Sequence, residues 1–336
     1  MKSLLLALIL LCAPLATAAP LDIYWIDVEG GAATLIVTPG GETVLMDAGW
    51  AGFEGRDANN IKKVLTEQAK KQKIDYFLTS HFHADHVGGL PGLAAIVPIT
   101  KFVDHGDSVE QANERSKKLW DAYVAVAQGK RMQVKPGDKL PVKGVDFTIV
   151  AARGKFLAQP LVDQGPNPLC GDVASKPLDE GENGKSVGFV VKMGKFDFLD
   201  LGDLSWNFEN EAACPKNLFG EIDLYQVTHH GMNMSGAPAH LGAIKPKVAV
   251  MNNGPRKGGS AETFESLKKQ KSLQDLWQVH RAVQVDDLTN ANEKFIANMG
   301  ETDGCQAHWI KASVEADGSY TVTNSRNNFS KKYQAE

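Results

Sequence analysis

Between residues 74 and 89 the chain reads IDYFLTSHFHADHVGG, a short apolar run followed at once by clustered histidines. The run from Ile74 to Thr79 predicts a buried β-strand. Three histidines and an aspartate then fall within the six residues from His81 to His86. Imidazole nitrogen and carboxylate oxygen are ligands that zinc prefers in proteins. The stretch therefore predicts a metal site at the end of a strand rather than a polar loop with coincidental histidines.

The spacing of these ligands favours two metal ions over one. His81 and His83 are two residues apart and can point to the same side of an extended loop. Asp85 and His86 follow on the next turn and face them. Two adjacent sets of nitrogen and oxygen ligands suit a pair of divalent cations, with zinc as the first expectation and manganese as the alternative.

Short β-rich runs and helices surround this stretch. Residues 23–28 and 34–38 predict a hairpin, and a third strand ends at Asp47. Asp57 is expected to cap the helix that follows. Ser108 is expected to cap another helix further along the chain.

The second half repeats this alternation in outline. Residues 186–201 predict a hairpin that ends just before Asp203, and residues 222–227 predict a strand that leads to His229 and His230. Alternating strands and helices indicate an α/β fold, which we expect to be one sandwich of two similar halves.

The composition is that of an ordinary globular protein. The chain has 336 residues, of which 43% are hydrophobic and 23% charged, and its formal net charge is −4. Because no basic surface is evident, there is no strong nucleic-acid signal, and the expected partner is a small-molecule or phosphoester substrate. We expect residues 19–336 to form a single domain that ends in a β-hairpin. The sequence does not define an oligomeric state.

The N-terminus has the pattern of an export signal. Lys2 is followed by an apolar run from Leu4 to Leu11, and small residues stand at Ala16 and Ala18. We therefore predict a signal peptide over residues 1–18 and a secreted or periplasmic protein. The apolar run is shorter than the roughly 20 residues of a membrane span, so no span is expected after cleavage.

Export changes the interpretation of the cysteines. Cys170 and Cys214 both lie in loop-like sequence rich in proline and glycine. In an oxidising compartment a disulfide between them is expected, with Cys305 left over; three free thiols are the alternative.

The motifs together resemble the metallo-β-lactamase superfamily. His81 to His86 matches its His-x-His-x-Asp-His motif, and Asp47 stands at the preceding strand end. Gly202-Asp203 resembles the motif whose aspartate bridges both metals, and the paired histidines before Gly231 resemble the last motif. The resemblance implies an αββα sandwich with the metals at one edge of the two sheets.

Within that superfamily the chain is most similar to the hydrolase domain of ComEC/Rec2-type competence proteins. The likeness lies in residues 27–35, 78–90 and 183–186 and in the paired histidines. One feature departs from true β-lactamases and lactonases, which place another histidine between the first cluster and Asp203. Here that interval holds only His105, too close to the cluster, so β-lactam hydrolysis is less expected.

The resemblance implies roles for the site residues. A hydroxide bound by two metals would attack the substrate, with Asp85 as a ligand that also guides a proton. Asp47 is expected to orient a ligand, and Lys185 or His230 to stabilise the developing oxyanion. The predicted metal ligands are His81, His83, Asp85, His86, Asp203 and His229.

His229 and His230 need separate roles. In an extended chain neighbouring side chains point to opposite sides, so one should bind metal while the other contacts substrate or packs. His229 is favoured as the ligand because it is nearer to the strand.

The expected function is that of an exported metal-dependent hydrolase of phosphodiester or phosphoester bonds. The phosphoester preference rests on the resemblance, since one fold hosts many substrates. One alternative is hydrolysis of a lactone, thioester or β-lactam. The other is a non-catalytic binding protein on the same fold, against which the complete ligand set argues.

Overall fold

The computed structural model describes residues 19–171, 175–301 and 306–336. The predicted signal peptide and Cys305 lie outside the described residues. Within the described part, no helix is both long enough and apolar enough to cross a membrane.

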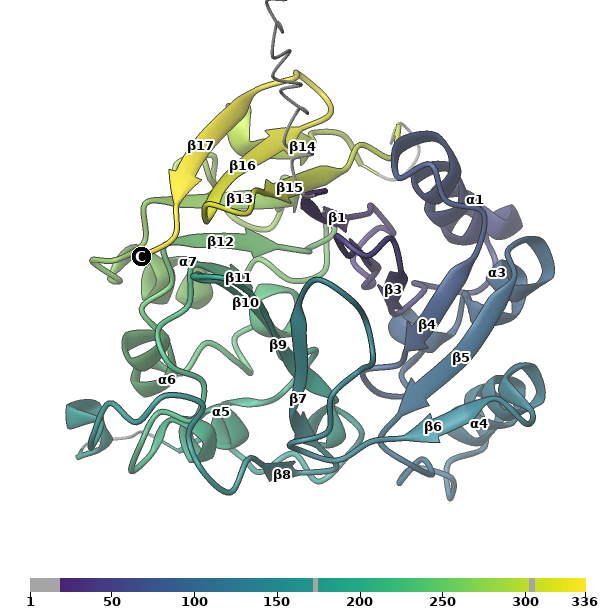
Figure 1. Cartoon of the computed structure of the whole chain (residues 1–336), viewed down its shortest axis with the longest axis horizontal. Helices are drawn as coiled ribbons and strands as arrows, with labels where there is room; N and C mark the ends of the chain where they lie inside the picture. The colour runs from purple at the N-terminus through teal and green to yellow at the C-terminus, as the bar shows by residue number, and fades with distance from the viewer. Residues whose placement is uncertain (1–18, 172–174, 302–305) are drawn as a thin grey trace, which may run out of the picture.

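Two large sheets form the centre of the molecule (Figure 1). The first sheet has the strand order β17-β16-β15-β1-β2-β3-β4-β5-β6. Its strands are β1 Leu21–Trp25, β2 Thr34–Val37, β3 Thr43–Met46, β4 Ile74–Leu78, β5 Ile99–Asp104, β6 Arg131–Gln133, β15 Ile310–Val314, β16 Ser319–Asn324 and β17 Ser330–Gln334. The second sheet has the order β14-β13-β12-β11-β10-β9-β7-β8. Its strands are β7 Asp146–Ala152, β8 Lys155–Phe156, β9 Gly188–Met193, β10 Phe196–Asp200, β11 Leu224–Gln226, β12 Val248–Met251, β13 Asp275–His280 and β14 Ile296–Asn298.

Helices cover the outer face of each sheet. In Figure 1, α1, α3 and α4 lie outside the first sheet, and α5, α6 and α7 lie outside the second. Their bounds are α1 Arg56–Lys63, α3 Leu90–Ile96, α4 Glu114–Ala127, α5 Trp206–Ala213, α6 Pro238–Ile244 and α7 Ala261–Lys268, and the short α2 spans Ala84–Val87. This arrangement is the αββα sandwich that the sequence predicted.

The two halves share one plan. In the first, β1, β2 and β3 are antiparallel, and β3, β4 and β5 are parallel. In the second, β7, β9 and β10 are antiparallel, and β10, β11 and β12 are parallel. The loops at the carboxyl ends of the parallel strands carry the residues of the metal motifs.

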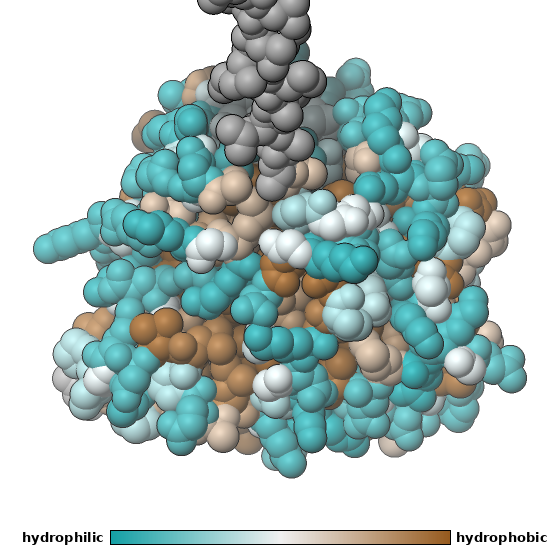
Figure 2. All heavy atoms as spheres, in the orientation of Figure 1, coloured by the Kyte–Doolittle hydropathy of each residue, from teal (hydrophilic) through white to brown (hydrophobic). Residues whose placement is uncertain are grey.

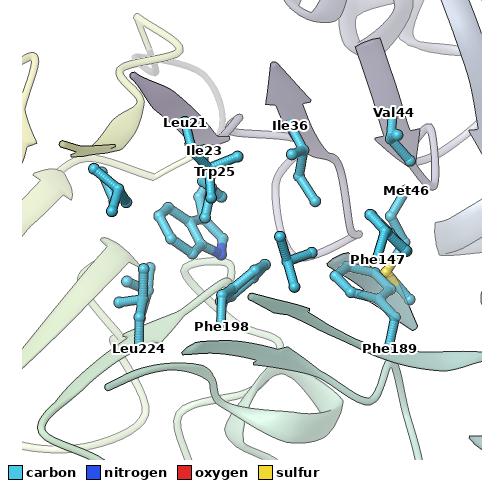
Figure 3. Close-up of a cluster of buried hydrophobic side chains, with 14 of the residues drawn as sticks. Leu21, Ile23, Trp25, Ile36, Val44, Met46, Phe147, Phe189, Phe198 and Leu224 are labelled. Atoms are coloured by element: carbon cyan, nitrogen blue, oxygen red, sulfur yellow. The ribbon is translucent and has the colours of Figure 1, made fainter. Parts of the chain in front are cut away.

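The main core lies between the sheets. Trp25 of the first sheet packs edge-on against Phe198 of the second, with ring centres 5.6 Å apart, and Phe147 packs on Phe189 nearby (Figure 3). Because side chains alternate along a strand, Ile36 enters this central cluster while its neighbour Leu35 faces the helices. Both faces of β2 are therefore buried, which explains its continuous apolar sequence.

The surface is of mixed character. On the face drawn in Figure 2 hydrophilic side chains predominate, and apolar side chains form smaller groups between them. The predicted disulfide is present, since Cys170 is bonded to Cys214. It ties the loop after β8 to the end of α5.

Two predicted helix caps are wrong. The cap position of α1 is Gly55, and Asp57 lies inside the first turn, where it accepts a hydrogen bond of 2.7 Å from the backbone N–H of Trp50. The cap of α4 is Asn113, whose side chain accepts two backbone N–H groups. Ser108 instead donates its hydroxyl to Glu182, 2.7 Å away. In both cases a contact with a neighbouring loop replaces the local capping bond.

Candidate metal centre

The first metal motif lies where β4 meets α2. His81 and His83 occupy the loop, and Asp85 and His86 lie in the first turn of α2. The turn is packed tightly, because a Cβ added at Gly89 would stand 2.1 Å from the carbonyl oxygen of Ala48. Glycine at this position therefore allows the motif to contact the loop after β3.

Four side-chain atoms from both halves of the molecule converge beside α2. They are Asp85 Oδ2, His86 Nε2, Asp203 Oδ2 and His230 Nε2, all buried and within 4.8 Å of one another. His86 Nε2 lies 3.1 Å from each of the two carboxylate oxygens and 3.2 Å from His230 Nε2. His230 Nε2 lies 3.4 Å from the Asp85 oxygen and 3.3 Å from the Asp203 oxygen.

These separations fit a metal ion. Ligands at about 2.0–2.1 Å around a tetrahedral zinc stand about 3.3 Å from each other. The second nitrogen of the His230 ring, Nδ1, lies 3.2 Å from the carbonyl oxygen of Asn252, which can only accept, so Nδ1 carries the hydrogen. With the hydrogen on Nδ1, Nε2 is the ring atom that can bind a metal, and a cation there would also pair with the carboxylates of Asp85 and Asp203.

A second group of ligand atoms adjoins the first. His81 Nε2 lies 3.0 Å from His83 Nδ1, and the His81 and His86 rings are 4.1 Å apart between centres. The two groups together fit a dimetal site. Ser186 stands close by, with its hydroxyl 3.5 Å from His81 Nδ1, in the segment where the sequence lacks the additional histidine of β-lactamases.

The loop with the paired histidines has an unusual backbone. Both His229 and His230 adopt left-handed conformations, with φ of 55° and 53°. The backbone N–H of His229 donates to the carbonyl of Gly202 over 3.0 Å, which joins this loop to the one that carries Asp203. His229 Nε2 lies 3.4 Å from Asp203 Oδ2. The structure thus brings both histidines to Asp203, and it places His230, rather than the favoured His229, in the four-atom cluster.

Carboxylates outside the cluster hold two of the rings. Asp47 Oδ2 lies 2.7 Å from His86 Nδ1, as expected for a residue that orients a ligand. Glu110, which the sequence did not single out, lies with Oε1 3.3 Å from His83 Nε2. The nearby Glu182 accepts the backbone N–H of Phe82 and pairs with His105, so His105 belongs to this supporting network.

Opposite charges within the cluster shift the pKa values of its members. Burial raises the pKa of Asp203, but the rings of His230 and His86 lower it more strongly, so this pKa lies well below its usual range. Burial lowers the pKa of His86, but Asp203 and Asp85 raise it well above its usual range. Asp200, the last residue of β10, has a pKa raised by burial to about 8. The site therefore keeps Asp203 ionised and favours positive charge among its neighbours.

Two lysines lie near the strand ends: Lys185, which the sequence singled out and whose role at the oxyanion stays a prediction, and Lys257, which it did not. The ammonium group of Lys185 lies 5.7 Å from the centre of the Phe208 ring, and within the described residues no hydrogen bond or ion pair joins it to the four-atom cluster. Lys257, by contrast, forms an ion pair with Asp85 Oδ2. Lys257 could have been identified from the sequence, because it lies in a glycine-rich loop after the parallel strand β12.

The other histidines lie apart from the cluster. His280 pairs with Asp27 over 2.8 Å, with Glu29 close by. His240 is buried between Phe219 and Tyr225, and burial lowers its pKa to about 3. Both side chains are fully buried.

Comparison with known proteins gives consistent matches. The model of the metallo-beta-lactamase superfamily matches residues 26–170. A UPF0173 metal-dependent hydrolase of Cupriavidus necator is 32% identical over 262 residues, which are 74% of this chain and 80% of that protein. Recombination protein 2 of Haemophilus influenzae is 25% identical over 80% of this chain, and the match spans only 30% of its own length.

Solved structures of similar proteins were also found. One is the metallo-beta-lactamase fold protein YhfI from Bacillus subtilis, which is 12% identical in sequence. The match covers 87% of this chain and 99% of the YhfI chain, with a TM-score of 0.45.

Proposed function

Because this chain belongs to the metallo-β-lactamase superfamily and is a metal-dependent hydrolase, we propose that it hydrolyses phosphodiester or phosphoester bonds outside the cytoplasm. The observation that carries the proposal is the convergence of Asp85, His86, Asp203 and His230 beside the His81–His83 pair. Such a ligand set suits two divalent cations, and zinc is our first choice, with manganese as the alternative.

Two observations support the substrate class. One relative is named as a recombination protein, and the strands that recombine are joined by phosphodiester bonds. The interval between the first motif and Asp203 also lacks the histidine typical of β-lactamases, and Ser186 lies near His81 in that segment. Both points favour a phosphoester over a β-lactam.

The residues of the chain would prepare the site for hydrolysis. When bound, the two cations lower the pKa of water from about 15.7 towards neutrality and neutralise charge on the reacting oxygens. Asp47 accepts the Nδ1 proton of His86 and so keeps Nε2 free to act as a ligand. The carbonyl of Asn252 fixes the His230 ring in the same way.

The proton for the leaving oxygen needs a donor. We assign this role to His229: burial lowers its pKa, so the ring would first take the proton of the attacking water and then pass it to the leaving oxygen. Its Nδ1 faces the hydroxyl of Ser235 at 3.3 Å. Its Nε2 lies 3.4 Å from Asp203 Oδ2, at the border of the cluster. The distances favour His230 as the metal ligand, which reverses the roles that the sequence favoured; the ligand role of His229 stays a prediction to be tested.

Substrate scope tests the proposal. Protein loaded with zinc, and separately with manganese, would be assayed on bis(p-nitrophenyl) phosphate, a lactone, a thioester and a cephalosporin. We expect the highest kcat/KM on the phosphodiester. A preference for the cephalosporin or the lactone would contradict it. If protein with both metals bound were inert on all four, a binding role on the same fold would be favoured.

Export forms the second part of the proposal. The disulfide between Cys170 and Cys214 supports an oxidising compartment, because such bonds are rare in the cytosol. Export can be tested by expressing the chain with residues 1–18 present. Mass spectrometry then identifies the N-terminal residue of the mature protein. Cleavage after Ala18 or Ala19 is expected, whereas an uncleaved chain in the cytosol would contradict export.

A further inference from the structure

Lys257 borders the metal centre and is partly exposed to solvent. It belongs to the loop after β12, and its ammonium group forms an ion pair with Asp85 Oδ2. The side chain is 28% exposed, and its Nζ lies 5.4 Å from the centre of the Trp50 ring. A positive charge thus stands between the buried ligands and the surface, in contact with both an acidic ligand and an aromatic ring.

Backbone contacts fix the loop that carries Lys257. The N–H of Gly259 donates to the carbonyl of His230 over 3.0 Å, and the N–H of Ser260 donates to that of Gly231 over 2.9 Å. Gly258 has a φ of +77°, and a Cβ added to it would stand 2.1 Å from the carbonyl oxygen of His230. The position of Lys257 is therefore tied to the position of His230.

The ammonium group and a metal ion would compete for one atom. Asp85 Oδ2 is both the partner of Lys257 and one of the four converging ligand atoms. A cation held by these four atoms would take the place of the ammonium group. The flexible four-carbon stem of lysine would then let Nζ leave Asp85, while the fixed loop would keep it beside the metal centre.

From this competition we infer a role in substrate binding. We propose that Lys257 binds an anionic oxygen of the phosphate whose ester bond is cleaved, so that the site favours negatively charged phosphoesters over uncharged lactones and thioesters. Lysine serves proteins as a point charge for phosphate. The charge of two divalent cations exceeds that of the carboxylates Asp85 and Asp203, which further favours an anion. This inference rests on the proposed function and assigns it a substrate-binding residue.

The test uses inorganic phosphate as the probe and zinc-loaded full-length mature protein. Calorimetry would measure the phosphate Kd of the wild type and of the variants Lys257→Met and Lys257→Arg. The matched control is Lys139→Met, because Lys139 is an exposed lysine paired with Asp146 at the surface. We expect Lys257→Met to weaken phosphate binding about tenfold or more, the usual scale for losing a charged contact. Lys257→Arg and the control should bind phosphate much as the wild type does.

A second measurement follows the metals themselves. Zinc titration against a chelator should show two zinc ions in Lys257→Met, bound as tightly as in the wild type or more tightly, because the competing ammonium group is gone. Unchanged phosphate binding in Lys257→Met, or no phosphate binding by the wild type, would overturn the inference. Loss of a zinc ion in this variant would also overturn it, since Lys257 would then support the site itself.

These results are separable from the proposed function. If Lys257→Met loses phosphate affinity while the wild type cleaves no phosphodiester, the inference stands and the proposed activity falls. If the wild type cleaves the phosphodiester and Lys257→Met does so with an unchanged KM, the activity stands and the inference falls.

Discussion

Asp47 and His86 form a buried pair in which Asp47 Oδ2 lies 2.7 Å from His86 Nδ1. Asp47 follows β3 directly, and His86 lies in α2, which follows the neighbouring parallel strand β4. Asp47 also accepts the backbone N–H and the hydroxyl of Ser80, at 2.8 Å and 2.6 Å. The pair therefore holds the ring that faces Asp85, Asp203 and His230.

Replacing Asp47 should weaken metal binding without removing a ligand. In Asp47→Asn the charged acceptor for His86 Nδ1 is lost, so zinc affinity should fall about 10- to 100-fold. Chelator competition measures the affinity. Asp223→Asn is a suitable control, because Asp223 is also buried but pairs with Lys247. Equal zinc affinity in Asp47→Asn and wild type would show that the pair has no role in metal binding.

Asp203 should prove essential for both metals. Its Oδ2 lies within 3.4 Å of the rings of His86, His229 and His230. In Asp203→Ala we expect metal content and hydrolysis to be lost together, measured by elemental analysis and by phosphodiester assay. A variant that retains two metals would contradict the bridging role.

Replacing His229 and replacing His230 should affect metal content and activity differently. His230→Ala removes an atom of the four-atom cluster, so it should lose one metal ion. His229→Ala should keep both ions and lower kcat, because it removes a proton donor worth typically 10²- to 10⁴-fold. Metal analysis and steady-state kinetics on the two variants decide the matter. The opposite pattern would restore His229 as the ligand.

Glu182 should make stability depend on acid pH. Burial raises its pKa, but the bonds to His105 and Ser108 lower it more, from 4.5 to about 2. A carboxyl with a lowered pKa stabilises the fold above its unfolded pKa, and this contribution disappears as the pH falls from about 4.5 towards 2. The maximum contribution is about 3 kcal/mol.

Urea unfolding of metal-free protein at pH 6, 4 and 3 tests this dependence. The free energy of unfolding of the wild type should fall more steeply with acid than that of Glu182→Gln, in which the group cannot titrate. Parallel curves would rule out Glu182 as a source of acid sensitivity.

The disulfide should matter for stability but not for metal binding. Cys170 and Cys214 are 44 residues apart, so the bond restricts a sizeable loop of the unfolded chain. Replacing both by serine should lower the free energy of unfolding by about 2–4 kcal/mol and leave zinc content unchanged. Loss of zinc in the double variant would show that the bond also shapes the metal centre.

Much of the site could be predicted because its signal is local. The ligands from His81 to His86 are contiguous, and a strand-end loop brings them together whatever the rest of the chain does. The alternation of strands and helices likewise predicted an α/β sandwich of two similar halves, and the resemblance to the metallo-β-lactamase superfamily implied its αββα layers. The pairing of Cys170 with Cys214 followed from their loop-like surroundings and the export signal.

The helix caps failed for the opposite reason. Asp57 and Ser108 have the local chemistry of caps, yet each hydrogen-bonds to a neighbouring loop. Glu110 carries no signal of its own, since its role depends on His83, 27 residues away.

The sequence by itself determined the ligand types, their place at strand ends and the class of fold, because these depend on short-range patterns. Only the tertiary structure decided which distant residues join them. Lys257 reaches Asp85 across 172 positions because the two halves stack at a common edge. His229 and His230 both reach Asp203 because their backbones are left-handed, whereas the alternation of an extended chain would have sent them to opposite sides.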